Sequence, residues 1–85
     1  MKIDLPDIVI QPDWNIPGQI KKVLEEAGEV AEAIAEVDPV NTIREALDTM
    51  QTCATLISMV QAEWSLPLDR FLREHAEKLE RKGYL

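Results

Sequence analysis

The sequence predicts an all-α protein, an antiparallel helical bundle of three main helices that follow an extended N-terminal arm. Two observations favour this fold class. Long runs of good helix formers carry apolar residues at helical spacing, and the runs are separated by Asp38-Pro39 and by Ser65-Leu66-Pro67. The breaks between them are short, and short connections favour antiparallel neighbours. We therefore expect residues 1–85 to form a single helical domain.

The first sixteen residues differ in character from the rest of the chain. Residues 1–16 contain two prolines, three aspartates and the apolar run Ile8-Val9-Ile10, so an extended arm is expected there. Good helix formers then predict the first helix at about residues 17–37. On a helical wheel its apolar residues fill one continuous arc, made by Ile20, Val23, Leu24, Ala27, Val30, Ala31, Ile34 and Val37.

The second helix is predicted at about residues 39–64. Asp38 is expected to cap it, and Pro39 fits its first turn, where a missing N–H does no harm. Its polar stripe is narrow, and nearly every other direction is apolar or small. Such a helix is buried, and in a chain of this length the burial needs a second subunit. We therefore expect oligomerisation to complete the bundle, as a homodimer or a homotetramer.

The third helix is predicted at about residues 67–82, with Gly83 as its C-terminal stop. One stripe of this helix is apolar apart from a single histidine. The stripe consists of Leu68, Phe71, Leu72, His75 and Leu79.

The charge balance and the composition narrow the class of partner. Nine Lys and Arg residues against sixteen Asp and Glu residues give a formal net charge of −7, which disfavours nucleic-acid binding. No apolar run approaches the roughly 20 residues of a membrane span, and Met1-Lys2-Ile3-Asp4 does not open a signal peptide. The single Cys53 allows no internal disulfide, and no Cys/His cluster offers a zinc site. We expect a cytoplasmic protein with no membrane partner.

Two pairs of carboxylates border the predicted core. Glu26 and Glu29 lie at the edge of the apolar arc of the first helix, and Glu45 and Asp48 lie off the polar stripe of the second. Residues three apart share a helix face, so each pair points to one side. Four carboxylates in a half-buried place repel one another, and a divalent cation removes that repulsion. All-oxygen ligation points to Mg²⁺, or to Mn²⁺ in its place.

Carboxylates three apart on a helix are also common on solvated faces. On that interpretation the protein is a non-catalytic acidic helical module that dimerises and binds a partner protein. Adding Mg²⁺ separates the two interpretations, because an ion stabilises a folded protein only where it binds.

The residues around these carboxylates resemble a known family. Glu25-Glu26-Ala27-Gly28-Glu29, followed after fifteen residues by Glu45-Ala46-Leu47-Asp48, is similar to the EExxE…ExxD signature of MazG-like nucleotide pyrophosphohydrolases, in the all-α NTP pyrophosphatase superfamily. The segment from Gln19 to Leu24 and the tail from His75 to Tyr84 resemble the family's flanking segments. The resemblance covers about residues 19–85 and leaves the arm uncovered.

The resemblance implies Mg-dependent hydrolysis of a nucleoside triphosphate, an NTP or a dNTP, between its α- and β-phosphates. The products are a nucleoside monophosphate and pyrophosphate. By matching positions, Glu26, Glu29, Glu45 and Asp48 are the implied Mg²⁺ ligands. Glu25 is implied to help activate the attacking water, so Glu25 and Glu26 are the candidate catalytic residues.

Further residues are expected to hold the triphosphate. The candidate substrate-binding residues are Gln19, Lys22, Lys78, Arg81, Lys82 and Tyr84. Lys22 lies beside Glu26 on the first helix, whereas the other basic candidates crowd the end of the third. The tail departs from the family at two positions, with Ala76 in place of Asn and Lys82 in place of Arg. Because Lys lacks the two-pronged geometry of Arg, we expect a different grip on phosphate.

Overall fold

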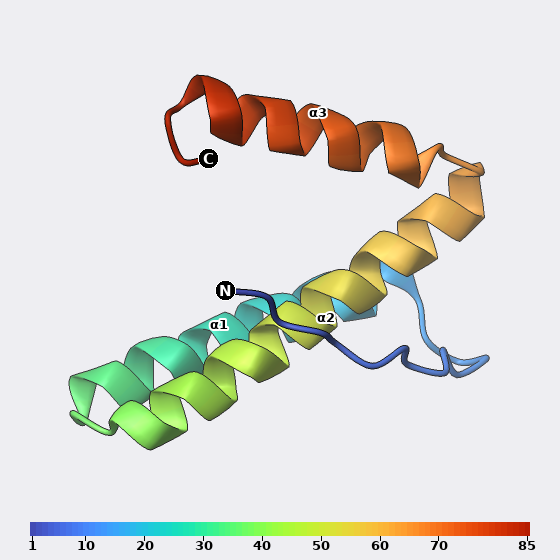
Figure 1. Ribbon diagram of the computed structural model, residues 1–85. Coiled ribbons are helices and arrows are strands. Elements are labelled where there is room, and N and C mark those ends of the chain that lie inside the picture. The colour runs from blue at the N-terminus through green and yellow to red at the C-terminus, as the bar shows by residue number, and fades with distance from the viewer.

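A computed structural model describes all residues, 1–85, and contains three helices and no strands. The helices are α1 (Ile16–Ala35), α2 (Pro39–Trp64) and α3 (Leu68–Arg81), and they follow an arm that has neither helix nor strand (Figure 1). The all-α class predicted from the sequence is confirmed. No helix combines the length and the hydropathy that a bilayer span requires.

Local chemistry sets the helix boundaries. Asn15 caps α1 and Asp38 caps α2, because each side-chain oxygen accepts a hydrogen bond from the backbone N–H three residues further on, at 2.8 and 3.0 Å. α1 ends at Ala35, earlier than the sequence predicts, and Val37 adopts a left-handed φ of 55° that turns the chain toward α2. Gly83, with a φ of 77°, follows the end of α3.

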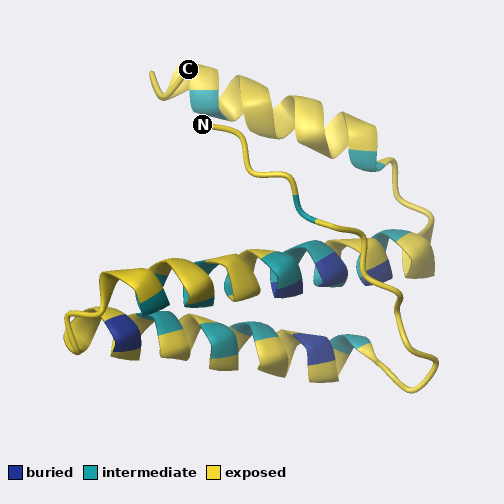
Figure 2. Ribbon diagram, turned by 60° about the horizontal axis from the view of Figure 1, so that its bottom comes forward, coloured by how far each residue is buried: buried dark blue, intermediate teal, exposed yellow.

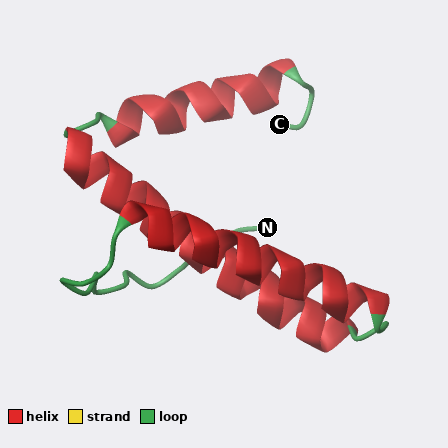
Figure 3. Cartoon of the chain, turned by 180° about the vertical axis from the view of Figure 1, so that it is seen from behind, coloured by secondary structure: helices red, strands yellow, loops and turns green.

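α1 and α2 form an antiparallel hairpin, and α3 stands away from it. Figures 1 and 3 show from opposite sides that the first two helices lie side by side while α3 turns back at the far end of α2. α1 and α2 are the only two helices with extensive mutual contact. Ser65, with a left-handed φ of 50°, and Pro67 redirect the chain between α2 and α3.

The buried core of the single chain is small. Its buried residues are Gln19, Ala33, Thr52, Thr55 and Met59. Figure 2 shows buried and half-buried residues on the facing sides of α1 and α2, whereas α3 is exposed along nearly its whole length. Several residues of the predicted apolar arc of α1 face solvent instead of α2, among them Leu24, which is 69% exposed. One chain therefore leaves much apolar helix surface uncovered.

Candidate metal centre

Polar side chains interrupt the face of α1 that meets α2. The buried and half-buried residues of α1 recur every three or four positions, as Ile16, Gln19, Val23, Glu26, Val30 and Ala33. Gln19 and Glu26 thus lie inside the hairpin, while the apolar Ile20 and Leu24 lie on the exposed side. The sequence indicated that Glu26 lies at an edge of the apolar arc, and the structure shows that this edge faces α2.

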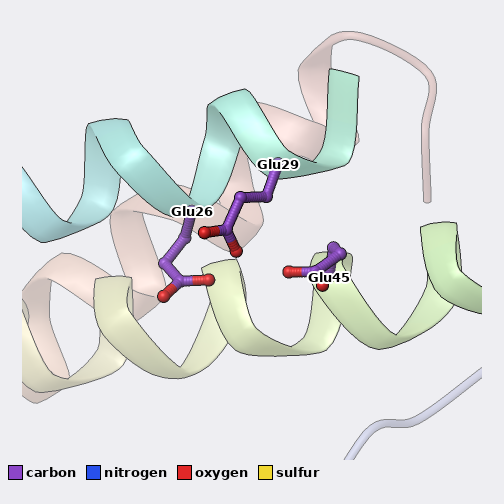
Figure 4. Close-up of side chains that lie close together, drawn as sticks. All are labelled: Glu26, Glu29 and Glu45. Carbon is purple, nitrogen blue, oxygen red and sulfur yellow. The ribbon is translucent and has the colours of Figure 1, made fainter. Parts of the chain in front are cut away.

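Three carboxylates meet across the hairpin, Glu26 and Glu29 from α1 and Glu45 from α2 (Figure 4). Each offers one oxygen, and these oxygens all lie within 4.8 Å of one another. Oxygens bound to a single Mg²⁺ lie roughly 3–4 Å apart, so small side-chain movements bring this set to ligand spacing. Glu26 and Glu45 are half-buried and Glu29 is exposed.

Two oxygens of this cluster have no hydrogen-bond partner. Oε2 of Glu26 and Oε2 of Glu45 are buried, and neither accepts a hydrogen bond. A buried carboxylate oxygen without a donor is costly. No basic side chain forms an ion pair with the cluster, since the one salt bridge of the chain joins Arg70 to Glu74 on α3. A divalent cation is the group that these unpaired oxygens fit.

The carboxylates also perturb one another's pKa. Burial raises the pKa of Glu26 above its ordinary value of 4.5, and the charges of Glu29 and Asp48 add to the rise, against a smaller lowering by Lys22. The neighbouring Glu45 carboxylate is the main cause that raises the pKa of Glu29, while the Glu26 carboxylate opposes that rise. Without a positive partner the cluster therefore favours proton uptake.

The remaining predicted carboxylates lie at the margin of the cluster. Asp48 does not belong to the close group of three, and it is exposed one turn after Glu45 on α2. Its charge nevertheless contributes to the raised pKa of Glu26. Glu25 is exposed next to Glu26. The structure thus gathers three of the four predicted ligands and keeps the fourth nearby.

Lys22 lies one turn before Glu26 and approaches the arm. Its ammonium is 6.0 Å from the centre of the Trp14 ring. Trp14, Gln19 and Lys22 line a cavity of about 230 Å³, and the Gln19 amide donates a 3.0 Å hydrogen bond to the Thr52 carbonyl that ties α1 to α2. The sequence does not predict that Trp14 lies close to Lys22, because the pattern of residues in an extended arm does not indicate which part of the chain the arm contacts.

A family model for the MazG nucleotide pyrophosphohydrolase domain matches residues 18–83, most of the chain and all of the clustered carboxylates. The chain belongs to this family. At the level of the family it is a nucleotide pyrophosphohydrolase, and MazG enzymes typically depend on a divalent metal, which the carboxylate cluster fits. No curated protein and no solved structure matches the chain.

The other predicted substrate contacts lie at the end of α3 and in the residues that follow it. Lys78, Arg81 and Lys82 lie within the match, whereas Tyr84 and Trp14 lie outside it. The four candidates near the end of α3 are exposed, and α3 does not pack against α1 (Figure 1). Within one chain of this MazG domain, only Lys22 and Gln19 of the predicted substrate contacts lie on the helix that carries Glu26.

Proposed function

We propose that this MazG domain hydrolyses a nucleoside triphosphate, an NTP or a dNTP, to a nucleoside monophosphate and pyrophosphate with Mg²⁺ as its metal. The observation that carries the proposal is the pair of buried, unpaired carboxylate oxygens of Glu26 and Glu45 on facing helices. Neither oxygen contributes a hydrogen bond to the fold, so folding alone gives no reason to bury them. A cation site would explain why these two oxygens are buried.

Glu26, Glu29 and Glu45 are the proposed ligands, with Asp48 as the fourth. A set made only of carboxylates favours a hard ion, Mg²⁺ or Mn²⁺, over the softer metals that prefer His and Cys. When bound, such an ion neutralises phosphate charge and lowers the pKa of a water molecule. The family supports divalent-metal dependence, and the choice of Mg²⁺ is our proposal.

Glu25 is the proposed proton acceptor. Glu25 is exposed and precedes Glu26 in α1, so its carboxylate is free to take a proton from the attacking water. The water oxygen forms a bond to one of the two phosphorus atoms of the α,β-anhydride, and the bond from that phosphorus to the bridging oxygen breaks. Hydrolysis of this kind needs positioning and charge neutralisation more than covalent help from the protein.

Lys22 is the proposed phosphate contact closest to the carboxylates, and Gln19 lines the same cavity. Lys78, Arg81, Lys82 and Tyr84 stay proposed substrate contacts. Because α3 does not pack against α1 of its own chain, they would reach a nucleotide most directly from a neighbouring copy in a homodimer or a homotetramer. The net charge of −7 makes these few cations important for holding a polyanion.

The test is a panel of NTPs and dNTPs scored for pyrophosphate release by the full chain, with Mg²⁺ and with a chelator. We expect release from at least one nucleotide with Mg²⁺ and none with the chelator. No release from any nucleotide, together with no change in melting temperature on adding Mg²⁺, would favour the alternative of a non-catalytic acidic interaction module.

A further inference from the structure

Trp14, in the arm just before α1, carries a large aromatic ring that lies outside the buried core. The residue is 38% exposed. The MazG match begins at residue 18, so the family gives this tryptophan no role. The Lys22 ammonium lies over its ring, 6.0 Å from the centre. A ring that is open to solvent beside a cation is available to a ligand that has both an apolar face and a negative charge.

Trp14 forms one wall of a polar hollow between the arm and the α1–α2 hairpin. The cavity of about 230 Å³ that it lines with Gln19 and Lys22 has a neighbour of about 100 Å³. The second cavity shares these three residues and extends to Gln51 and Thr55 of α2. The arm, α1 and α2 thus each supply a wall. Together the two cavities reach the lower end of the roughly 300–1,000 Å³ that small-molecule sites occupy.

Hydrogen bonds hold the arm in the position that closes this hollow. The Gln51 side-chain amide donates to the Pro6 carbonyl at 2.9 Å and so ties the arm to α2. The Trp14 N–H donates to the Gln11 carbonyl at 3.1 Å, and the next residue, Asn15, caps α1. The backbone of Trp14 is therefore fixed on both sides. A ring whose backbone is already in place loses little conformational freedom when a ligand binds.

Lys22 connects this hollow to the carboxylate cluster. It lies four residues before Glu26, which is about 6 Å along α1, and residues four apart share a helix face. Trp14, Lys22 and Glu26 therefore follow one another as an aromatic ring, a cation and a carboxylate. A nucleotide with a bound metal carries the matching groups in the same order, namely an aromatic base, phosphates and a cation.

We propose that Trp14 stacks on the base of the nucleotide and so makes the site prefer nucleotides over other phosphate compounds. This inference rests on the proposed function and adds to it a residue that the MazG match does not include. Because every base has a π face, stacking on an aromatic side chain tolerates any base. Trp14 therefore supplies affinity for the nucleoside, while Lys22 keeps its proposed contact with phosphate.

The test compares ligands with and without a base. The α,β-methylene triphosphates of adenosine, guanosine, cytidine and uridine carry a base and resist hydrolysis between the α- and β-phosphates, whereas inorganic tripolyphosphate has no base. Calorimetry on the full chain with Mg²⁺ gives their dissociation constants. For the tightest nucleotide, Trp14→Ala should raise the constant about tenfold or more. Trp14→Phe keeps a ring and should raise it much less. The constant for tripolyphosphate should stay within about twofold in both variants.

The second tryptophan of the chain, Trp64, provides the matched control. It is also exposed, at 60%, but it lines neither of the cavities that contain Lys22. Trp64→Ala should leave all the dissociation constants unchanged. In Trp64→Phe, Trp14 is the only tryptophan, so its fluorescence should change on saturation with the nucleotide and much less with tripolyphosphate. This measurement does not depend on whether Trp14→Ala folds.

Equal nucleotide affinity in wild type and Trp14→Ala would overturn the proposal, as would a wild-type chain that binds none of the four nucleotides. An equal loss of affinity for nucleotide and tripolyphosphate would also overturn it, because Trp14 would then act only through the arm or through Lys22. Unchanged Trp14 fluorescence in Trp64→Phe at saturating nucleotide would do the same.

The proposal and the proposed function can fail separately. Pyrophosphate release by Trp14→Ala with the wild-type KM would overturn the stacking and leave the function intact. Nucleotide binding that depends on Trp14, without pyrophosphate release from any NTP or dNTP, would support the stacking and contradict the function.

Discussion

Two regions of the molecule depart from the usual distribution of polar and apolar groups in opposite ways: the α1–α2 hairpin, and the apolar groove between the C-terminal half of α2 and α3. The hairpin buries carboxylate oxygens of Glu26 and Glu45 without a partner, and the groove leaves Phe71 and Leu72 open to solvent. In an isolated chain both arrangements are unfavourable, the first through desolvation and the second through unburied apolar area. A bound cation would offset the first cost, and burial of the groove against other apolar surface would offset the second.

The two regions also differ in the apolar packing around them. In the hairpin, half-buried Val23 and Val30 and buried Ala33 share the face of α1 that carries Glu26, so apolar packing flanks the acidic cluster. α3 has no buried residue at all. Apolar packing within the chain therefore stabilises the hairpin, whereas no packing of this kind within the chain covers α3. Substitutions in the hairpin and changes of ion or pH test that contrast, and the largest effect is expected at Glu45.

Replacing Glu45 with Gln should lower turnover about a hundredfold or more, because one ligand of the metal loses its charge while the side chain keeps its shape. The helical spectrum and the oligomeric mass should not change. Pyrophosphate release at saturating nucleotide and Mg²⁺ measures the effect. Glu36→Gln, an exposed residue at the end of α1, is the control and should keep the wild-type rate. Wild-type turnover in Glu45→Gln would show that catalysis does not require the carboxylate cluster of the hairpin.

Adding Mg²⁺ should stabilise the protein. Linkage gives about 2.7 kcal/mol at a free Mg²⁺ concentration one hundred times its dissociation constant. Thermal melts with Mg²⁺, and with a monovalent salt at equal ionic strength as the control, measure the shift. Equal melting temperatures in the two salts would show that the carboxylates are merely solvated.

Replacing Lys22 with Ala should raise KM about tenfold and change kcat less, because the ammonium is proposed to bind a phosphate of the nucleotide in both the ground state and the transition state. Lys21→Ala is the matched control, since Lys21 is the adjacent cation on α1 and does not line the cavity with Trp14. Equal changes in KM for the two variants would show that the loss of one positive charge anywhere on this part of α1 explains the effect, without a specific contact of Lys22 with phosphate.

Replacing Glu29 with Gln should stabilise the metal-free protein slightly at neutral pH. The pKa of Glu29 is raised in the folded state, so the folded protein binds protons more readily than the unfolded chain does. The contribution of Glu29 to the stability of the wild type therefore falls as the pH rises above about 4.5, and the variant lacks that loss. Denaturant melts in a chelator should show a difference that shrinks toward zero at pH 4. A difference that grows with acidity would contradict the assigned pKa shift.

The sequence predicted the features that depend on residues close together in the chain, such as helix caps and helical spacing. Asp38 and Pro39 predicted the start of α2, Gly83 the stop after α3, and the spacing of Glu26 and Glu29 their common side. These features depend on backbone dihedrals and on helical period, which short stretches of sequence specify.

The sequence predicted less about how the helices pack against one another. A helical wheel gives the width of the apolar arc of α1 but does not say which sector meets α2, so Leu24 outside and Gln19 inside could not be foreseen. For the same reason the sequence could not show that Asp48 lies outside the close cluster. The direction of α3 depends on a few dihedrals at Ser65 and on hydrogen bonds of Gln61, and hydrophobic periodicity does not report those.

The central claim is that Glu26 and Glu45 hold a divalent cation, and direct binding of Mn²⁺ to the full chain tests it without any catalytic assay. The electron paramagnetic resonance signal of free Mn²⁺ can be followed as protein is added. We predict saturable binding by wild type and by Glu36→Gln, and its loss in a variant that carries both Glu26→Gln and Glu45→Gln. Equal binding by that double variant, or no binding by wild type at millimolar protein, would contradict the claim.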